Sequence, residues 1–272
     1  MQLRVLLYET PDDPYMNLAF EEALPRARGC GISPDTLRLW RNRRAVVIGY
    51  FQRAEEEVNL AEAERQGVRV VRRFTGGGAA YHDLGNINYA ISLSLGERKV
   101  SNPVDFIFTE LIRAPVEALR SLGLEASVQN VNDIIVDNRK VSGTAATISW
   151  GSIFFHGAML VSADLGVLAS VLKVPLKKLI DKGVSSVKYR VTNLAALRPG
   201  TTVNEVASAL ASSFAKVLGY DGVKYDLPTS EELEMAEVLY SYKYSDSSWN
   251  MDRAPHRQFR KAEEELMRVC RR

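Results

Sequence analysis

The sequence lacks several features that would assign a function directly. Its 272 residues contain only two cysteines, Cys30 and Cys270, and neither has the spacing of a metal ligand. Two cysteines make no disulfide framework, so we expect reduced thiols and a cytoplasmic protein. No apolar run approaches the ~20 residues that span a bilayer. Residues 3–8, directly after Met1, are too short and wrongly flanked for a signal peptide. We therefore expect no membrane partner.

The sequence also lacks an excess of charge of either sign. It has 35 basic and 33 acidic residues, a net charge of +2, which gives no reason to expect bulk binding of nucleic acid. It shows no internal repeat and no low-complexity tract. With 46% hydrophobic and 25% charged residues, the composition is that of an ordinary globular protein. The length suits one large domain or two small ones.

A glycine-rich stretch at residues 72–83, RRFTGGGAAYHD, is the strongest chemical signal that is present. Arg72 and Arg73 offer forked, permanently charged donors that suit phosphate or carboxylate. Three bare glycines follow, and successive backbone N–H groups in such a loop can bind an anion. No Gly-Lys-Ser/Thr closes the loop and its glycines are contiguous, which excludes the P-loop and dinucleotide motifs. The stretch predicts a phosphate cradle, with a flexible hairpin connection as the alternative.

A second signal is the predicted hairpin of residues 132–143, with its turn at Asp137 and Asn138. Lys140 lies just after this turn and is followed by a run of small residues that lets a ligand approach closely. A lysine ammonium can hold a phosphate and a neighbouring carbonyl oxygen together. A solvated hairpin lysine is the alternative. His82 and His156 lie in the glycine-rich stretch and in an apolar strand, and a histidine so placed is more often structural than catalytic.

Hydrophobic periodicity predicts strands first and helices later, which favours a mixed α/β or α+β domain. The expected strands are residues 3–8, 37–40, 45–49, 68–71, 88–95, 132–136, 139–143 and 153–161. The expected helices are residues 15–28, 59–66, 104–122, 164–172, 175–182, 203–218, 231–242 and part of 256–272. Asn42 and Arg43 mark a turn between two strands, and Pro115 should kink or break its helix. From the residues alone, we predict an anion or nucleotide site on such a domain.

These stretches, taken together, resemble the signatures of the lipoate–protein ligase A family. The resemblance runs in order through residues 72–86, 132–134, 139–145, 156–160, 183–194, 243–244 and 248–250. It implies the fold of biotin and lipoate ligases, related to class II aminoacyl-tRNA synthetases: a mixed, largely antiparallel sheet flanked by helices. Residues 1–253 would form the catalytic domain, and residues 254–272 would form a helical tail.

The resemblance also implies a reaction and its partners. ATP and lipoate would give lipoyl-AMP and pyrophosphate, with Mg²⁺ as the metal. A lysine of a lipoyl domain, in an E2 subunit of a 2-oxoacid dehydrogenase or in the glycine cleavage H protein, would then attack the activated carbonyl. Many family members carry an accessory domain after the catalytic one, and here only residues 254–272 follow the last motif. We therefore expect the large subunit of a split ligase, served by a separate small accessory subunit.

By the same resemblance, Lys140 would be the catalytic residue, between the lipoyl carbonyl and the α-phosphate. The residues implied to contact ATP or lipoyl-AMP are Arg73, Gly76, Gly77, Gly78, Ala79, Ala80, Tyr81, Asn132, Asp133 and Lys140. The residues implied for the lipoate pocket are His82, Lys140, Gly143, Thr144 and His156. Asn132 and Asp133 would hold the adenylate or a metal, with Asp133 as the metal ligand, and the sequence does not separate these roles.

We weigh three other functions against that of a lipoate–protein ligase. A lipoyl or octanoyl transferase of the same fold would need a cysteine nucleophile beside the acyl pocket, and both cysteines lie outside the signature stretches. A biotin ligase would carry a glycine–arginine-rich loop that this chain lacks. A lipoate-binding subunit without catalysis would have no use for Lys140 and Arg73, both of which are present.

Overall fold

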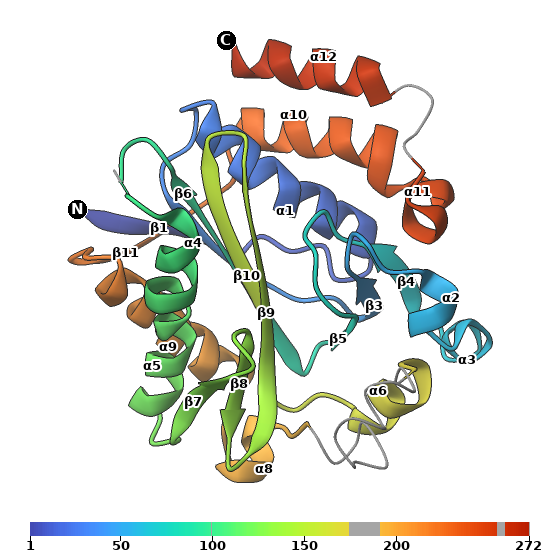
Figure 1. Cartoon of the computed structure of the whole chain (residues 1–272), viewed down its shortest axis with the longest axis vertical. Coiled ribbons are helices and arrows are strands. Elements are labelled where there is room, and N and C mark those ends of the chain that lie inside the picture. Colours follow the sequence, from blue (N-terminus) through green and yellow to red (C-terminus); the bar gives the residue numbers. More distant parts are fainter. Residues whose placement is uncertain (99, 174–190, 255–258, 272) are drawn as a thin grey trace.

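The computed structural model describes residues 1–98, 100–173, 191–254 and 259–271, and its strands form two sheets (Figure 1). The larger sheet has the order β11-β1-β2-β6-β10-β9-β8-β7, and the smaller has the order β4-β3-β5. The larger sheet consists of β1 (Gln2–Leu6), β2 (Thr36–Trp40), β6 (Asn86–Ser94), β7 (Ala126–Gln129), β8 (Asp133–Val136), β9 (Arg139–Ser149), β10 (Ser152–Leu160) and β11 (Gly222–Asp226). The smaller consists of β3 (Arg44–Ile48), β4 (Arg69–Arg72) and β5 (Ala80–Asp83).

Strand β1 pairs in parallel with β2 and β11, and β3 pairs in parallel with β4. The remaining ladders between these strands are antiparallel. The mixed, largely antiparallel sheet flanked by helices is therefore confirmed. The sequence did not indicate β5, β7 or β11. These three strands are four or five residues long, and such short segments have little periodicity to detect.

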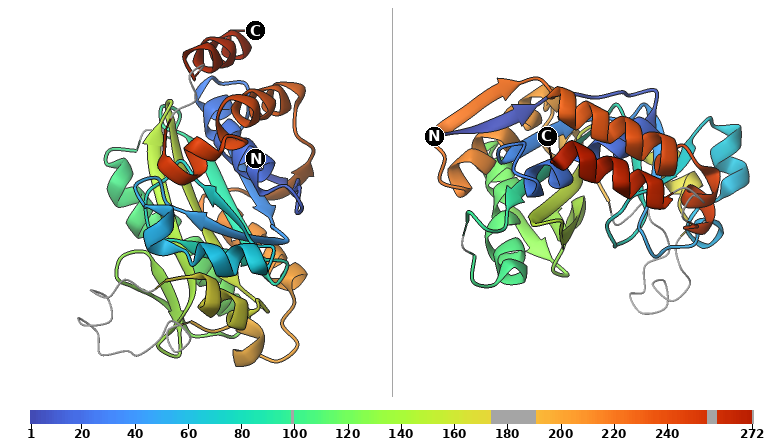
Figure 2. Two further views of the ribbon diagram at one scale, coloured as in Figure 1. Left: turned by 90° about the vertical axis from the view of Figure 1, so that its right-hand side faces the viewer. Right: turned by 90° about the horizontal axis from the view of Figure 1, so that it is seen from above.

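Helices cover both faces of the larger sheet (Figures 1 and 2). The helices are α1 (Pro14–Gly29), α2 (Ala54–Glu57), α3 (Leu60–Arg65), α4 (Pro103–Phe106), α5 (Arg113–Ser121), α6 (Leu165–Val171), α8 (Leu194–Leu197), α9 (Val203–Val217), α10 (Ser230–Leu239), α11 (Ser247–Asp252) and α12 (Phe259–Cys270). Helices α5 and α9 pack on one face around Phe214, and α1 and α10 pack on the other around Phe20. Among the described residues, no helix has both the length and the apolar character needed to cross a membrane.

Several local expectations can be compared with these elements. The turn at Asn42 and Arg43 carries the chain from the larger sheet to the smaller one. The segment 104–122 is interrupted, as expected, by a π-helical turn at Ile107–Leu111. Pro115 lies in the first turn of α5, and its ring crowds the carbonyl of Leu111 four residues earlier. The helix expected at residues 175–182 lies outside the described residues, and the boundary at residue 253 stays a prediction.

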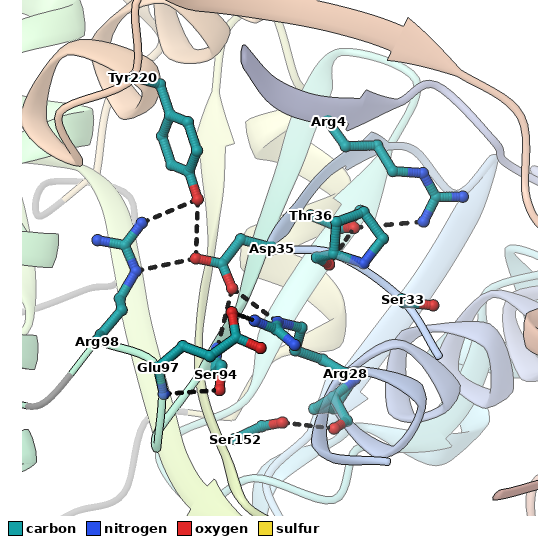
Figure 3. A network of polar contacts seen from close by, with 12 residues as sticks. Arg4, Arg28, Ser33, Asp35, Thr36, Ser94, Glu97, Arg98, Ser152 and Tyr220 are labelled. Carbon is teal, nitrogen blue, oxygen red and sulfur yellow. Dashed lines mark hydrogen bonds and ion pairs between the residues drawn. The ribbon is translucent and has the colours of Figure 1, made fainter. Parts of the chain in front are cut away.

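A buried carboxylate joins three parts of the chain at one end of the larger sheet (Figure 3). Asp35 accepts hydrogen bonds from Arg28 of α1 at 2.7 Å, from Tyr220 after α9 at 2.8 Å and from Arg98 at 2.9 Å. It also accepts one from the Ser94 backbone N–H at the end of β6. Burial opposes ionisation of Asp35, but these donors, led by Arg28, hold its pKa below its ordinary value.

A second buried carboxylate connects α1 to the C-terminal helices. Glu22 accepts hydrogen bonds from Arg26 at 2.8 Å, from Lys243 at 2.5 Å and from the Tyr244 hydroxyl at 2.6 Å. Burial opposes its charge, but Lys243 and Arg26 lower the pKa of Glu22 to about 2. Arg26 also pairs with Glu263 of α12. Arg26 therefore connects the buried Glu22 to α12, although α1 and α12 are far apart in sequence.

The expectation of two reduced cysteines is wrong. Cys30, at the end of α1, and Cys270, at the end of α12, form a disulfide with their Cα atoms 5.3 Å apart. The two residues are separated by 240 positions, so the sequence contains no local signal of their pairing. They meet because α12 packs Leu266 and Val269 into the same core as α1.

We predict that the disulfide stabilises the protein, because it closes a very long loop and restricts the unfolded chain. Cys270→Ser should lower the free energy of unfolding by about 2–5 kcal/mol. Thermal unfolding with and without dithiothreitol measures this effect. The reductant should destabilise the original protein and leave Cys270→Ser unchanged. Two titratable thiols in the unreduced, denatured protein would contradict the prediction.

Candidate functional site

A cavity of about 840 Å³ lies where the larger sheet meets the smaller one. Both sequence signatures contribute to its lining: Gly78 and Tyr81 come from the glycine-rich stretch, and Asp133 and Lys140 come from the β8–β9 hairpin. His156, from β10, lies in the same lining. The structure therefore brings together segments that are separated by more than fifty positions in the sequence.

Arg73 holds the shape of the glycine-rich loop. Its guanidinium donates to the carbonyl oxygens of Gly76 at 2.6 Å and Gly78 at 2.9 Å, and to the Thr75 hydroxyl at 3.0 Å. It also donates to the backbone of Val47 on β3. Arg73 is buried, and burial lowers its pKa to about 10. A guanidinium with this pKa still carries its charge at neutral pH, so Arg73 places a positive charge beneath the loop.

The residues of the loop differ in their exposure to the cavity. Gly78, Ala79, Ala80 and Tyr81 line it, whereas Gly76 and Gly77 are outside the lining. Gly77 has φ +94°, and a Cβ there would lie 2.9 Å from Nη2 of Arg73. Gly77 therefore lets the loop close on the arginine, while the space around Gly78 is open.

Arg72, which the sequence offered as a second phosphate ligand, has a different role. Its side chain is fully buried and donates to the carbonyl oxygens of Gly49, Tyr50 and Gln52 and of Trp249 and Met251. These bonds attach α11 to the smaller sheet. The expectation of a phosphate contact from Arg72 is wrong, because its donors are used by backbone carbonyls.

Lys140 projects over the first part of β9 and is partly exposed. Its Nζ lies 2.5 Å from Oδ1 of Asp133 on the neighbouring strand β8. Beneath it, a Cβ on Gly143 would lie 2.8 Å from Nζ and 3.0 Å from Cε. The absence of a side chain at Gly143 therefore makes room for the lysine, and Asp133 orients it. The turn residues Asp137 and Asn138 have φ +49° and +57°, which are typical of the tight hairpin expected from the sequence.

Asn132 and Thr144 fix the start of this hairpin. The Asn132 side chain donates to the Thr144 carbonyl at 3.0 Å, and the Thr144 N–H donates to the Asn132 carbonyl at 2.9 Å. Both residues line the cavity. Among the described residues, Asp133 belongs to no group of three or more side chains that could hold a metal ion. The role of Asp133 as a metal ligand stays a prediction.

The two histidines of the signatures lie on the cavity wall in different surroundings. His82 is buried, and burial lowers its pKa to about 3, so its ring is neutral at physiological pH. Its Nδ1 lies 3.3 Å from the Asn42 amide nitrogen. His156 bonds through Nε2 to Thr75 at 2.7 Å, and its Nδ1 lies 3.3 Å from the carboxylate of Glu21.

This geometry can be compared with known proteins. The family model of the lipoyl protein ligase A/B catalytic domain matches residues 13–215. The chain belongs to this family. Lipoate-protein ligase A subunit 1 of Thermoplasma acidophilum is 38% identical over 92% of this chain and 97% of its own length. Lipoate-protein ligase LplJ of Bacillus subtilis is 32% identical, over 90% of this chain and 72% of its own length.

Solved structures of lipoate ligases agree with this assignment. The T. acidophilum bipartite lipoate protein ligase, solved in a study that includes its E2 lipoyl domain, has a TM-score of 0.82 at 39% identity, covering 92% of this chain and 96% of its own. A lipoate-protein ligase A structure with bound ATP has a TM-score of 0.81 at 36% identity, covering 92% of this chain and 99% of its own.

The cavity residues of this family member that sequence reasoning missed include Glu21, Trp40 and Asn88. Glu21 is buried on α1 and accepts a hydrogen bond from the Trp40 indole at 3.2 Å. Burial opposes its charge, but His156 beside it lowers the pKa of Glu21. Residues 17–28 of α1 are all buried, so the helix has no polar side against which Glu21 would have stood out in the sequence.

We predict that Gly143→Ala displaces Lys140 and slows the reaction at this site. The added methyl group would occupy the space of the lysine Nζ and Cε, while the backbone of Gly143 needs no positive φ. A displacement of about 1 Å in a reacting group can reduce the rate up to about 100-fold. Single-turnover formation of lipoyl-AMP measures the loss.

Gly222→Ala is the matched control, because Gly222 is also a strand glycine and a Cβ there meets nothing within 4 Å. The control should keep its rate. Equal rates for the two variants would show that the reaction does not depend on the space that Gly143 leaves for the Lys140 side chain.

Proposed function

We propose that this chain is the catalytic subunit of a lipoate–protein ligase. It activates lipoate with ATP to give lipoyl-AMP and pyrophosphate, and transfers the lipoyl group to a lysine of a lipoyl domain. The observation that carries this proposal is the convergence of the Lys140 ammonium with the backbone of residues 78–81 on one cavity. The relatives supply the substrate class, since they include a lipoate ligase bound with ATP and a T. acidophilum protein with bound lipoic acid.

The first step must bring two anions together. A carboxylate oxygen of lipoate attacks the α-phosphorus of ATP, and pyrophosphate leaves with the electrons of the broken P–O bond. The Lys140 ammonium offsets the repulsion between carboxylate and phosphate and stabilises the charge that develops on the phosphate oxygens. Asp133 orients Lys140. Residues 78–81 lay their backbone along the nucleotide, and Arg73 contributes its positive charge to the phosphate site through the loop that it holds.

In the second step, the amine of the acceptor lysine attacks the activated carbonyl. An amide forms, AMP leaves, and the amine releases its proton. AMP is a far better leaving group than the oxide ion that a free carboxylate would have to expel. Lys140 remains beside the carbonyl oxygen through both steps, which is why we assign it the catalytic role. His82, Gly143, Thr144 and His156 surround the acyl chain.

In this proposal, Mg²⁺ enters the site bound to ATP. Magnesium is usually held by one or two carboxylates together with substrate phosphates and water, rather than by a protein cage. A single carboxylate from Asp133 fits that pattern, and Asn132 beside it would contact the adenylate. Mg²⁺ would then neutralise the phosphate oxygens as pyrophosphate leaves.

A partner requirement is part of the proposal. The T. acidophilum relative is named as one subunit of its ligase, and the corresponding structure is described as bipartite. This chain covers 97% of that subunit. We infer that a separate small subunit completes this enzyme and that a lipoyl domain is the acceptor. A cytoplasmic location stays a prediction, because the two cysteines whose reduced state suggested it are bonded to each other.

A transferase that forms a thioester on the enzyme is the alternative. Such a mechanism needs a thiolate in the acyl pocket. Cys30 and Cys270 are bonded to each other and neither lines the cavity. This arrangement favours the ligase, whose reaction requires no protein nucleophile.

We predict that Lys140→Ala folds normally and loses most of its adenylation activity. Loss of one charge that stabilises the transition state lowers the rate about 100- to 1,000-fold, or ~3 kcal/mol. Single-turnover formation of lipoyl-AMP and thermal unfolding test the two parts. Arg139→Ala is the matched control, because it removes a neighbouring, exposed charge of the same hairpin that is not in the cavity lining. Wild-type rates in Lys140→Ala would refute the catalytic role.

We also predict that the isolated chain adenylates lipoate poorly. The assay mixes the chain with ATP, Mg²⁺, lipoate and a lipoyl domain, with and without the accessory subunit. Mass spectrometry of the lipoyl domain measures transfer, and omission of ATP is the control. Full lipoylation by the chain alone would eliminate the partner requirement and leave the ligase assignment intact.

A further inference from the structure

The floor of the cavity contains a row of residues that lie opposite one another on adjacent strands. Trp40 on β2 pairs with Asn88 on β6, Asn88 with Ala158 on β10, and Ala158 with Gly143 on β9. All four line the cavity. Residues directly opposite on antiparallel strands present their side chains to the same face. The row therefore leads across the cavity floor from the indole of Trp40 to the place where Lys140 lies over Gly143.

Asn88 is unusual in this row because its amide has no partner among the described residues. Its side chain is 2% exposed, and neither Oδ1 nor Nδ2 makes a hydrogen bond to any residue that the structure describes. Other buried amides are bonded: Asn86 donates to the Tyr81 carbonyl, and Asn250 donates to the Tyr244 carbonyl. An unsatisfied buried amide costs roughly 1–3 kcal/mol. Its position on the cavity wall indicates that a ligand satisfies it.

The spacing of the strands shows which part of a ligand would reach Asn88. Neighbouring strands are about 4.8 Å apart, so Asn88 lies two spacings, or about 10 Å, from Gly143. If lipoate has its carboxyl group at Lys140, as the proposed function requires, its extended chain covers roughly this distance. The dithiolane ring then lies against Asn88, between Ala158 and the Trp40 indole.

We propose that the Asn88 amide donates a hydrogen bond to a dithiolane sulfur and thereby selects lipoate over saturated acyl chains. A thioether-like sulfur is a weak hydrogen-bond acceptor, whereas the end of octanoate offers only C–H groups. An apolar chain that displaces water from Asn88 leaves the amide unpaired, and sites built around a polar partner reject analogues that lack it. Asn88 is a specificity residue of the proposed reaction, and the inference rests on that function.

The test compares three acids that share a carboxyl group and a similar length. Lipoate carries the dithiolane, octanoate is a straight chain, and 5-cyclopentylpentanoate replaces both sulfurs by methylenes at almost constant shape. For each acid, we measure equilibrium binding by calorimetry and the ATP–pyrophosphate exchange that depends on that acid. The accessory subunit is included wherever the chain requires it. We expect the original protein to prefer lipoate to its carbocyclic analogue about tenfold.

Asn88→Leu, which keeps the side-chain volume and removes the amide, should abolish that preference by improving the binding of the two sulfur-free acids. Asn88→Ala provides a second variant with less bulk. Ser92→Ala is the matched control, because the Ser92 hydroxyl on β6 is also buried, has no partner within the described ranges and lies outside the cavity lining. It should retain the preference. Thermal unfolding verifies that each variant is folded.

The outcomes separate this inference from the proposed function. A merely structural role for Asn88 would change the binding of all three acids equally and leave their ratio unchanged, which would overturn the inference. A wild-type protein that binds lipoate and the carbocycle equally would also overturn it. Absence of exchange with every acid would contradict the ligase function, while the binding ratio would still decide the role of Asn88.

Discussion

Two adjacent arginines at the end of β4 provide the constraint on which the site depends. Arg72 is the last residue of β4 and Arg73 follows it directly, yet their side chains contact different parts of the chain. Arg72 attaches α11 and the turn after β3 through five backbone carbonyls. Arg73 holds the glycine-rich loop from the cavity side. One arginine therefore anchors the framework and the other shapes the ligand-binding backbone. Removing the Arg72 guanidinium would leave buried carbonyls such as that of Gly49 unpaired, and removing that of Arg73 would deprive the loop carbonyls of Gly76 and Gly78 of their donor.

The loop held by Arg73 acquires its function from a hairpin on the other sheet. A Cβ at Gly77 would lie 3.7 Å from the Cβ of Ala145 on β9, so the glycine-rich loop lies close to the strand that carries Lys140. A charged hairpin lysine alone would be solvated. Here Asp133 and the bare backbone of Gly143 hold it at the cavity that the glycine-rich loop also lines. Positioning of charge before the substrate arrives is the main source of catalysis expected at such a site.

Much of the fold and of the candidate site could be predicted from sequence, because the strongest sequence signals come from residues that are neighbours in the chain. The hairpin turn at Asp137 and Asn138 needs positive φ angles that asparagine and aspartate tolerate, and Pro115 interrupts its helix by a steric effect on its own neighbours. Edge strands such as β7 and β11 were missed because they are short and exposed. The buried roles of Glu21 and Asn88 were missed because polar residues at single positions carry no periodic signal.

The distribution of polar groups in the core also explains how distant helices are fixed. Glu22 keeps its charge in the interior because two cations and a hydroxyl surround it, and those groups come from α1 and from the segment after α10. Cys30 and Cys270 meet at the far end of the same helix contact. Removing the ion pairs around Glu22 or the disulfide would weaken the attachment of α12 to α1. Neither Glu22 nor the two cysteines line the cavity. The stability of the C-terminal helix and the chemistry of the site are therefore largely separate.

The sequence by itself determined most of the longer secondary-structure elements, the glycine-rich loop, the lysine hairpin and, through their order, the family. Each of these depends on residues close together in the chain, whose backbone preferences act before folding is complete. Tertiary structure decided which arginine faces the cavity, which carboxylate orients Lys140, where the two cysteines meet and why Asn88 lies in the cavity lining without a partner in the described part of the chain. Those properties depend on burial and on strand register between distant segments. Register is set by the packing of whole sheets rather than by any one stretch.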